Sequence, residues 1–278
     1  MLMFDDIHVD AHGDTDVGNV RAENQDQYLI AALHKVVELH GTSIPEAYSR
    51  RFDSGARALL LLVADGVGGG LGGDEASSVT LDAIMDYVTN SMRCFYKLDE
   101  QIPHDLLVEL AATVERSHAA VRSRAEETPD RAGMATTLTM AHVLWPRAYV
   151  VHIGDSRCYR FRSGELLQLT KDQTVVQDLI DSGALDPEDA ATSPYAHVLS
   201  QAIGGHSDVQ PVISRVDLEP DDTLLLCTDG LTAHLDDDAI AERLGAEGDA
   251  KSIVHRLVEQ ALDAGGSDNV TVVVSRFA

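Results

Sequence analysis

Four aspartates stand where apolar, strand-like runs of this chain begin or end. One aspartate in such a place is usually a turn residue. If the four runs lie side by side, however, their carboxylates converge, and convergent carboxylates repel one another and must bind hard cations or protons. The four are Asp65 after residues 59–64, Asp155 after residues 147–153, Asp229 after residues 222–227, and Asp268 before residues 270–274.

Carboxylates of this kind can form a site for two metal ions. Asp65 can bridge two divalent ions about 4 Å apart, and Gly66 has no side chain to block its carbonyl oxygen. Asp229 and Asp268 would complete the first ion's protein ligands. Few protein ligands and many waters are typical of Mg²⁺ or Mn²⁺, whereas the lack of a Cys/His cluster disfavours zinc. A water between the ions suits phosphoester hydrolysis, and Arg21 could hold the phosphate with a bidentate fork.

Composition limits the other functions open to the chain. Its formal charge of −25 argues against a nucleic-acid or anionic-membrane surface. The 278 residues, 44% of them hydrophobic, suffice for one large domain. No run approaches the roughly 20 apolar residues of a membrane span, and residues 1–14 lack a basic segment followed by an apolar one. We therefore expect a cytoplasmic protein, and its three distant cysteines predict no disulfide framework or metal site.

The predicted helices come in pairs rather than alternating with strands, which indicates an α+β fold. Residues 209–217 and 222–227 are expected to form a hairpin around residues 219–221. Residues 34–56 form a long polar insertion. We expect it either to contain a helical turn of its own or to pack over the site. The predicted helices span residues 74–97, 103–126, 236–244 and 249–264, and the other strands residues 7–18, 26–33, 135–143, 148–153, 158–161 and 270–276.

Six short motifs, in this order, together resemble the bacterial branch of the metal-dependent (type 2C, PPM) protein serine/threonine phosphatases. Each motif alone is weak, but the ordered set is highly specific and extends over about residues 12–276. The motifs are RAENQD at 21–26, ADGVGG at 64–69, GMATTL at 133–138, VHIGDSR at 151–157, TDGL at 228–231 and SDNV at 267–270.

The resemblance implies a single catalytic domain over residues 1–278, built as a sandwich of two antiparallel sheets flanked by helix pairs. It implies hydrolysis of phosphoserine and phosphothreonine in proteins by a metal-bound water, with a mobile flap at residues 174–197 beside the cleft. The phosphorylated proteins would be substrates of serine/threonine kinases. We expect the protein to act as a monomer.

The resemblance also assigns roles to individual residues. It implies two tightly bound Mn²⁺ or Mg²⁺ ions and a third, weaker one. By position, Asp65 bridges the two tight ions, and Asp229 and Asp268 bind the first of them. The Gly66 carbonyl binds the second ion, where Gln25 and Asp26 order water. Asp155 shares the third ion with Asp229, Arg21 binds phosphate, and Asn269 supports the ligands.

Three positions depart from the family pattern. Gly70 stands where the family often has a histidine that is a candidate general acid, so water or another group, such as His12 or His152, would have to supply the proton. Gln173 replaces the histidine of an Asp-His-Ser motif, and Ala135 replaces a glycine. These changes leave two alternatives open. A degenerate phosphatase could bind phosphoproteins without turnover, or the aspartates could be mere strand-end caps that bind no ion.

Overall fold

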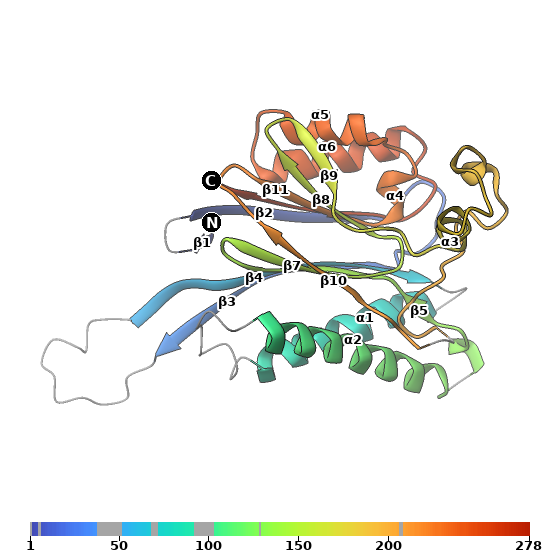
Figure 1. The fold of residues 1–278 in the computed structure, drawn as a ribbon, viewed down its shortest axis with the longest axis horizontal. Coiled ribbons are helices and arrows are strands. Elements are labelled where there is room, and N and C mark those ends of the chain that lie inside the picture. Colours follow the sequence, from blue (N-terminus) through green and yellow to red (C-terminus); the bar gives the residue numbers. More distant parts are fainter. Residues whose placement is uncertain are drawn as a thin grey trace, which may run out of the picture.

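Two antiparallel sheets lie face to face at the centre of the molecule, with helices on both outer sides (Figure 1). The computed structural model describes residues 2–4, 7–37, 52–67, 72–91, 103–127, 129–205 and 208–278. Every strand pairing within these ranges is antiparallel. The α+β sandwich expected from the sequence is confirmed.

The first sheet combines strands from both ends of the chain. Its order is β1 (Leu2–Phe4), β2 (Ile7–Asp16), β12 (Val270–Phe277), β11 (Thr223–Cys227), β8 (Arg157–Arg162) and β9 (Glu165–Gln168). The second sheet is formed by the middle of the chain. Its order is β10 (Val212–Asp217), β7 (Arg147–Ile153), β6 (Leu138–Leu144), β4 (Phe52–Val67) and β3 (Asp26–Val37), with β5 (Ala135–Thr136) paired to the end of β4.

Helices cover the outer face of each sheet (Figure 1). Strand β4 shows how the layers are held together, because its apolar run is buried on both faces. Leu59 and Leu61 pack between the two sheets, whereas Leu60 and Leu62 pack against the helices. The helices are α1 (Gly72–Ser91) and α2 (Pro103–Ala125) on the second sheet, and α4 (Asp229–Thr232), α5 (Asp237–Gly245) and α6 (Ala250–Asp263) on the first.

The predicted hairpin over residues 209–227 is wrong. Strand β10 pairs with β7 in the second sheet, whereas β11 pairs with β8 and β12 in the first. Two contacts hold the chain where it crosses between the sheets. Leu218 is buried in the core between them. The fully buried carboxylate of Asp222 accepts two hydrogen bonds of 2.6 Å from Arg162 on β8, in the first sheet. The local pattern shows two strands separated by a turn, but it does not show that they belong to different sheets.

Other boundaries also differ from the sequence-based expectation. Strand β3 continues to Val37 and β4 begins at Phe52, so both ends of the predicted insertion at 34–56 are strand. Residues 38–51 lie outside the described ranges, as do residues 92–97 at the end of the first predicted helix. The short elements β9 and α4 were not predicted. The flap region contains helix α3 (Val175–Asp181) and the 3-10 helix η3 (Pro187–Thr192). In the described part of the chain, no helix has the length and apolar character needed to cross a membrane.

Candidate active site

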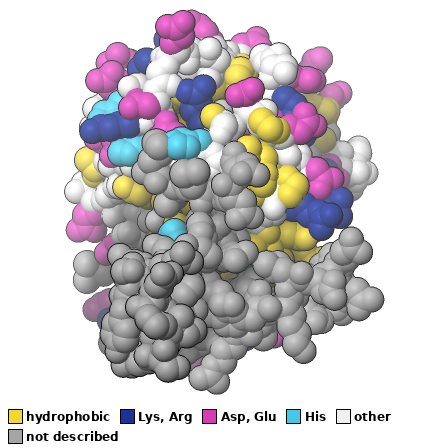
Figure 2. Space-filling view, turned by 90° about the vertical axis from the view of Figure 1, so that its left-hand side faces the viewer, with side chains coloured by type: hydrophobic (Ala, Val, Ile, Leu, Met, Phe, Trp, Pro, Cys, Tyr) yellow, Lys and Arg dark blue, Asp and Glu magenta, His cyan; other side chains and the backbone are white. Residues whose placement is uncertain are grey.

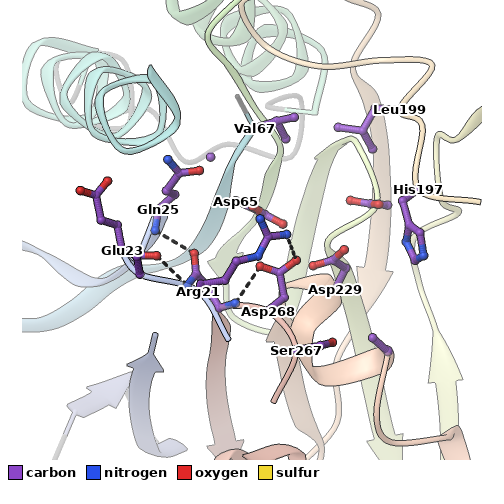
Figure 3. Close-up of a pocket in the computed structure, with 15 residues that line it drawn as sticks. Arg21, Glu23, Gln25, Asp65, Val67, His197, Leu199, Asp229, Ser267 and Asp268 are labelled. Carbon is purple, nitrogen blue, oxygen red and sulfur yellow. Dashed lines mark hydrogen bonds and ion pairs between the residues drawn. The ribbon is translucent and has the colours of Figure 1, made fainter. Parts of the chain in front are cut away.

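A pocket of about 740 Å³ lies where the end of β4 faces the start of α4 (Figure 3). It brings together segments from the N-terminal loop, β4, the loop after β7, the flap, α4 and the loop before β12. Its lining comprises Arg21, Ala22, Glu23, Gln25, Asp65, Gly66, Val67, Asp155, His197, Leu199, Asp229, Ala233, Ser267, Asp268 and Asn269.

The four predicted aspartates line this one pocket, but they do not come from four neighbouring strands. Asp65 lies near the end of β4 and Asp155 follows β7, and β6 separates these two strands in the second sheet. Asp229 and Asp268 lie at the adjacent ends of β11 and β12 in the first sheet. The carboxylates therefore converge across the gap between two packed sheets. That geometry depends on how the sheets stack, which the strand pattern does not reveal.

Buried hydroxyl groups hold the backbone of Asp65. Its N–H donates to Oγ1 of Thr137 at 2.9 Å, and its carbonyl accepts from Oγ1 of Thr136 at 2.8 Å. Thr137 Oγ1 also lies 2.7 Å from Oγ of Ser156, the residue that follows Asp155. The backbone of Asp65 is thus joined through buried hydroxyls to Ser156, the residue after Asp155, which limits the relative movement of these two segments.

Asp26 lies beneath the pocket rather than in its lining. It pairs with Asp65 across β3 and β4, is 3% exposed, and points toward the first sheet. Its Oδ2 accepts hydrogen bonds from the hydroxyls of Thr228 at 2.8 Å and Thr271 at 2.7 Å, whereas its buried Oδ1 has no hydrogen-bond partner in the described part of the chain. A buried carboxylate oxygen without a donor is costly unless it faces a proton, a water or a cation.

Two glycines leave space for the backbone beside Asp65. A Cβ on Gly66 would lie 2.3 Å from the carbonyl oxygen of Gly73, and one on Gly73 would lie 2.5 Å from Oε1 of Gln25 and 2.8 Å from the carbonyl oxygen of Gly66. No side chain fits at either position without moving the backbone. The contact between the end of β4 and the start of α1 therefore requires glycine on both sides.

Asn269 fastens the N-terminal loop to the start of β12. Its Nδ2 donates to the carbonyls of Val17 and Glu23, both at 2.9 Å, and its Oδ1 accepts from the N–H of Gln25 at 2.9 Å. The same loop carries Arg21, whose Nη2 lies 2.6 Å from Oδ2 of Asp268. Asn269 thus brings the pocket's arginine to its carboxylates, across almost the whole length of the sequence.

The carboxylates raise one another's pKa values. Burial is the largest cause at Asp65, whose pKa is raised well above its ordinary value, and the charges of Asp26, Asp229 and Asp155 add to it. Burial followed by neighbouring carboxylates also raises the pKa of Asp26 and of Asp155 to about 7. Among the described lining residues, Arg21 is the one Arg or Lys that opposes this negative charge. The pocket therefore favours protons or cations.

The donor set fits hard divalent cations. Asp229 has a buried Oδ1 without a hydrogen-bond partner in the described part of the chain, as does Asp26 below it. The described residues contain no group of three or more His, Cys, Asp or Glu side chains already arranged around one point. That is compatible with ions that keep most of their waters, as Mg²⁺ does. Oxygen donors alone do not suit a structural zinc site.

The root of the flap is bonded to the loop that carries Asp155. Residues 171–173 each contact this loop or a strand residue beside it. The Lys171 carbonyl lies 3.0 Å from Nε2 of His152, and Asp172 binds Arg157 through two oxygens. Gln173 exchanges two hydrogen bonds with Gly154. The Gly154 N–H donates to Oε1 of Gln173 at 2.8 Å. Gln173, one of the departures from the family pattern, therefore has a defined structural role here.

Several residues that the sequence suggested for the site lie elsewhere. Gly70 is outside the described residues. His12 stacks on His255 with ring centroids 5.8 Å apart and does not line the pocket, and His152 is buried with Thr139 Oγ1 2.9 Å from its Nδ1. Sequence reasoning missed His197, the one histidine of the predicted flap. Its position in the chain offered the signal, because it ends a segment expected to lie beside the cleft. The other lining residues that were not assigned to the site are Ala22, Glu23, Val67, Leu199, Ala233 and Ser267.

Comparison with known proteins places these features in context. Residues 47–265 match the family profile described as protein phosphatase 2C. The serine/threonine protein phosphatase PstP of Mycobacterium tuberculosis is 42% identical over 221 residues, which are 79% of this chain and 40% of PstP. Protein phosphatase PhpP of Streptococcus pneumoniae is 30% identical over 261 residues, 94% of each chain. This chain thus spans about two fifths of the length of PstP and nearly all of PhpP.

The same likeness holds in three dimensions. The crystal structure of the M. tuberculosis serine/threonine phosphatase PstP/Ppp superposes with a TM-score of 0.76 at 36% identity, covering 96% of this chain and 98% of that one. A structure of the PstP catalytic domain in complex with two manganese ions gives a TM-score of 0.74 at 36% identity, covering 98% of this chain and 100% of that one.

Proposed function

This chain belongs to the protein phosphatase 2C family, and from that membership we propose that it is a Mn²⁺- or Mg²⁺-dependent phosphatase that hydrolyses phosphoserine and phosphothreonine in proteins. The observation that carries the proposal is the convergence of Asp65, Asp155, Asp229 and Asp268 on one pocket. These carboxylates are poorly solvated and have a single Arg or Lys among the described lining residues. A cation-dependent reaction on an anionic substrate accounts for this arrangement.

In this proposal the carboxylates and one backbone carbonyl would hold the ions. Asp65 and the Gly66 carbonyl lie at the end of β4, and Asp229 and Asp268 face them from the first sheet. Asp155 would hold a third, weaker ion. Gln25 and the buried Asp26 would order water, and Asn269 would support the ligands. Bound divalent ions supply a nucleophilic water near neutral pH and neutralise the developing negative charge.

Arg21 would bind and orient the phosphate. Its side chain is 56% exposed, and its Nη2 is bonded to Asp268. A guanidinium has five N–H donors, so others remain available for phosphate oxygens. The Asp268 carboxylate holds the guanidinium close to the place where a substrate phosphate would meet the ions. This orientation favours a bidentate contact that a lysine could not reproduce.

An assay of the purified chain tests the proposal. We expect turnover of p-nitrophenyl phosphate and of a phosphothreonine peptide with Mn²⁺ or Mg²⁺, and none after removal of the ions by EDTA. Asp229→Asn should lose this turnover, whereas Asp82→Asn on the exposed face of α1 should keep it. Tight ion binding without turnover of either substrate would instead support a phosphoprotein-binding module. The expectation of a cytoplasmic monomer that opposes serine/threonine kinases remains a prediction.

A further inference from the structure

We propose that His197, carried by the flap, protonates the leaving alkoxide of the serine or threonine substrate; this inference rests on the proposed function. His197 lines the same pocket as the four carboxylates. Figure 3 shows it beyond Asp229, on the side opposite Glu23 and Gln25. The sequence assigns no general acid, because Gly70 stands where the resemblance calls for histidine.

The depth of the pocket places His197 where a leaving group would be. The carboxylates form its inner surface, since Asp65, Asp155 and Asp229 are partly buried at the ends of the sheets, whereas His197 is exposed at the mouth. The histidines that Figure 2 shows at the surface lie on the left-hand side of Figure 1, the end of the molecule away from α3, α4 and β5, so they are not part of this pocket. Attacking and leaving oxygens lie roughly in line during phosphoryl transfer. A nucleophile activated over the carboxylates therefore expels the leaving oxygen toward the mouth, where the flap supplies side chains.

No other described lining residue has suitable proton-donor chemistry at the mouth. Arg21 is exposed there, but a guanidinium does not release its proton in proteins. The hydroxyl of Ser267 is a much weaker acid than an imidazolium, and Glu23 is exposed on the opposite side (Figure 3). Histidine is the side chain whose ordinary charge change falls near neutral pH, and His197 is the one histidine of the described lining.

The position of His197 is held by its neighbours while its ring is left free. The N–H of Val175 donates to the carbonyl of Val198 at 2.8 Å, and Leu199 forms a bridge with Thr174. These contacts tie the returning side of the flap to its root. In the described part of the chain the imidazole of His197 has no hydrogen-bond partner of its own. By contrast, His234 accepts from the N–H of Ser267, and both ring nitrogens of His152 are engaged.

The imidazole of His197 lies close enough to the carboxylates to interact electrostatically with Asp229. Burial and the charge of Asp268 raise the pKa of Asp229, whereas the hydrogen bond with Asp65 and the positive charges of His197 and Arg21 lower it. A protonated ring close to the substrate is the form that a general acid requires.

The reaction balances without any further reactant. A bond forms between the oxygen of water and phosphorus, and the bond between phosphorus and the serine or threonine oxygen breaks. The imidazolium of His197 gives its proton to that oxygen, producing the free hydroxyl. The proton released by the attacking water returns to the imidazole through solvent. The products are inorganic phosphate and the dephosphorylated protein.

Leaving-group dependence distinguishes this role from a structural one. An alkyl leaving group needs the proton, whereas p-nitrophenolate needs little help, and a positioned acid typically contributes about 10²- to 10⁴-fold. We expect His197→Ala to lower kcat for a phosphothreonine peptide by about 10²-fold. For p-nitrophenyl phosphate the loss in kcat should be about tenfold or less. Added imidazole should restore part of the peptide rate. Tyr195→Ala, an exposed flap neighbour outside the lining, is the matched control.

Manganese binding by calorimetry and the thermal midpoint of the variant, measured alongside the rates, separate catalysis from folding. Equal losses on the two substrates, or a peptide rate within about threefold of wild type, would overturn the role of His197 and leave the proposed function intact. If the wild-type chain turns over neither substrate, the proposed function fails and this inference fails with it.

Discussion

The inner surface and the mouth of the pocket are built in different ways. The inner carboxylates stand at strand ends whose backbones are held by buried hydroxyls, as Thr136 and Thr137 hold Asp65. The mouth residues Arg21 and His197 lie on loops and are exposed. Burial therefore controls the chemistry of the inner surface, because desolvation is the largest cause of the raised carboxyl pKa values there. The mouth is held mainly by hydrogen bonds between loops.

This contrast predicts two kinds of mutational response. A change in the inner surface should remove the chemistry while relieving repulsion between buried charges, so activity and stability move in opposite directions. A change at the mouth or in its supports should give graded losses, because each contact contributes separately. The four predictions that follow run from the largest expected effect to the smallest.

Asp65→Asn should abolish activity. Metal-assisted charge stabilisation is worth several kcal/mol, so we expect a loss of roughly 10³-fold or more in kcat with saturating Mn²⁺. The metal-free variant should melt at a higher temperature than metal-free wild type, because one buried negative charge is gone. Steady-state kinetics and thermal melts in EDTA measure both effects. Near-normal turnover would contradict the placement of Asp65 at the centre of the ion site.

Arg21→Ala should weaken catalysis without removing it. Charge-assisted hydrogen bonds contribute about 1.5–3 kcal/mol, so kcat/KM should fall by roughly 10- to 100-fold. Arg21→Lys should recover only part of the loss because it cannot form a bidentate contact. Manganese affinity should stay the same or increase, since Asp268 loses its partner at 2.6 Å. Arg147→Ala, on a half-exposed side chain at the start of β7, serves as control. Weaker manganese binding would indicate that Arg21 supports the ions instead.

Gln173→Ala should have a smaller effect, exerted through the flap root. It leaves the buried N–H of Gly154 without its acceptor, which costs about 1–3 kcal/mol of unfolding free energy. We expect a loss of less than about tenfold in kcat/KM, because the change only loosens the support of Asp155 and the flap. Gln173→Glu keeps an acceptor oxygen and should restore most of the stability. Chemical denaturation and peptide kinetics test this. Equal destabilisation by both variants would reject the hydrogen bond as the cause.

The stability of the metal-free protein should fall as pH rises from about 4 to about 7. The pKa of Asp155 is about 7 in the folded chain, above its ordinary value of 3.8. Between these values the folded state holds a proton that the unfolded state has released, so rising pH favours unfolding. The melting temperature in EDTA should drop by a few degrees more in wild type than in Asp155→Asn. Saturating Mn²⁺ should abolish that difference. Parallel pH profiles of the two proteins would contradict the raised pKa.

Much of the architecture could be predicted from the sequence. The apolar run of β4 predicted a strand, and its side chains are buried on both faces; a helix was predicted over residues 103–126, and α2 there packs against the second sheet. Periodicity reports which face of an element avoids water, and that is a local property. The residue types and motifs around Asp65, Asp155, Asp229 and Asp268 are also local features, and they indicated oxygen-donor metal chemistry. One such carboxylate is usually a turn residue, but four that converge must bind cations or protons.

Only the tertiary structure decided which elements become neighbours. It places β10 and β11 in different sheets, buries Asp26 under the pocket, and uses Asn269 to join segments more than two hundred residues apart. It also brings His197, from the predicted flap, into the lining of the same pocket as the carboxylates. None of these contacts leaves a local pattern, because each depends on how two sheets and three loops pack together. The sequence by itself determined the chemical groups; the packing of the sheets determined which of them face the same substrate.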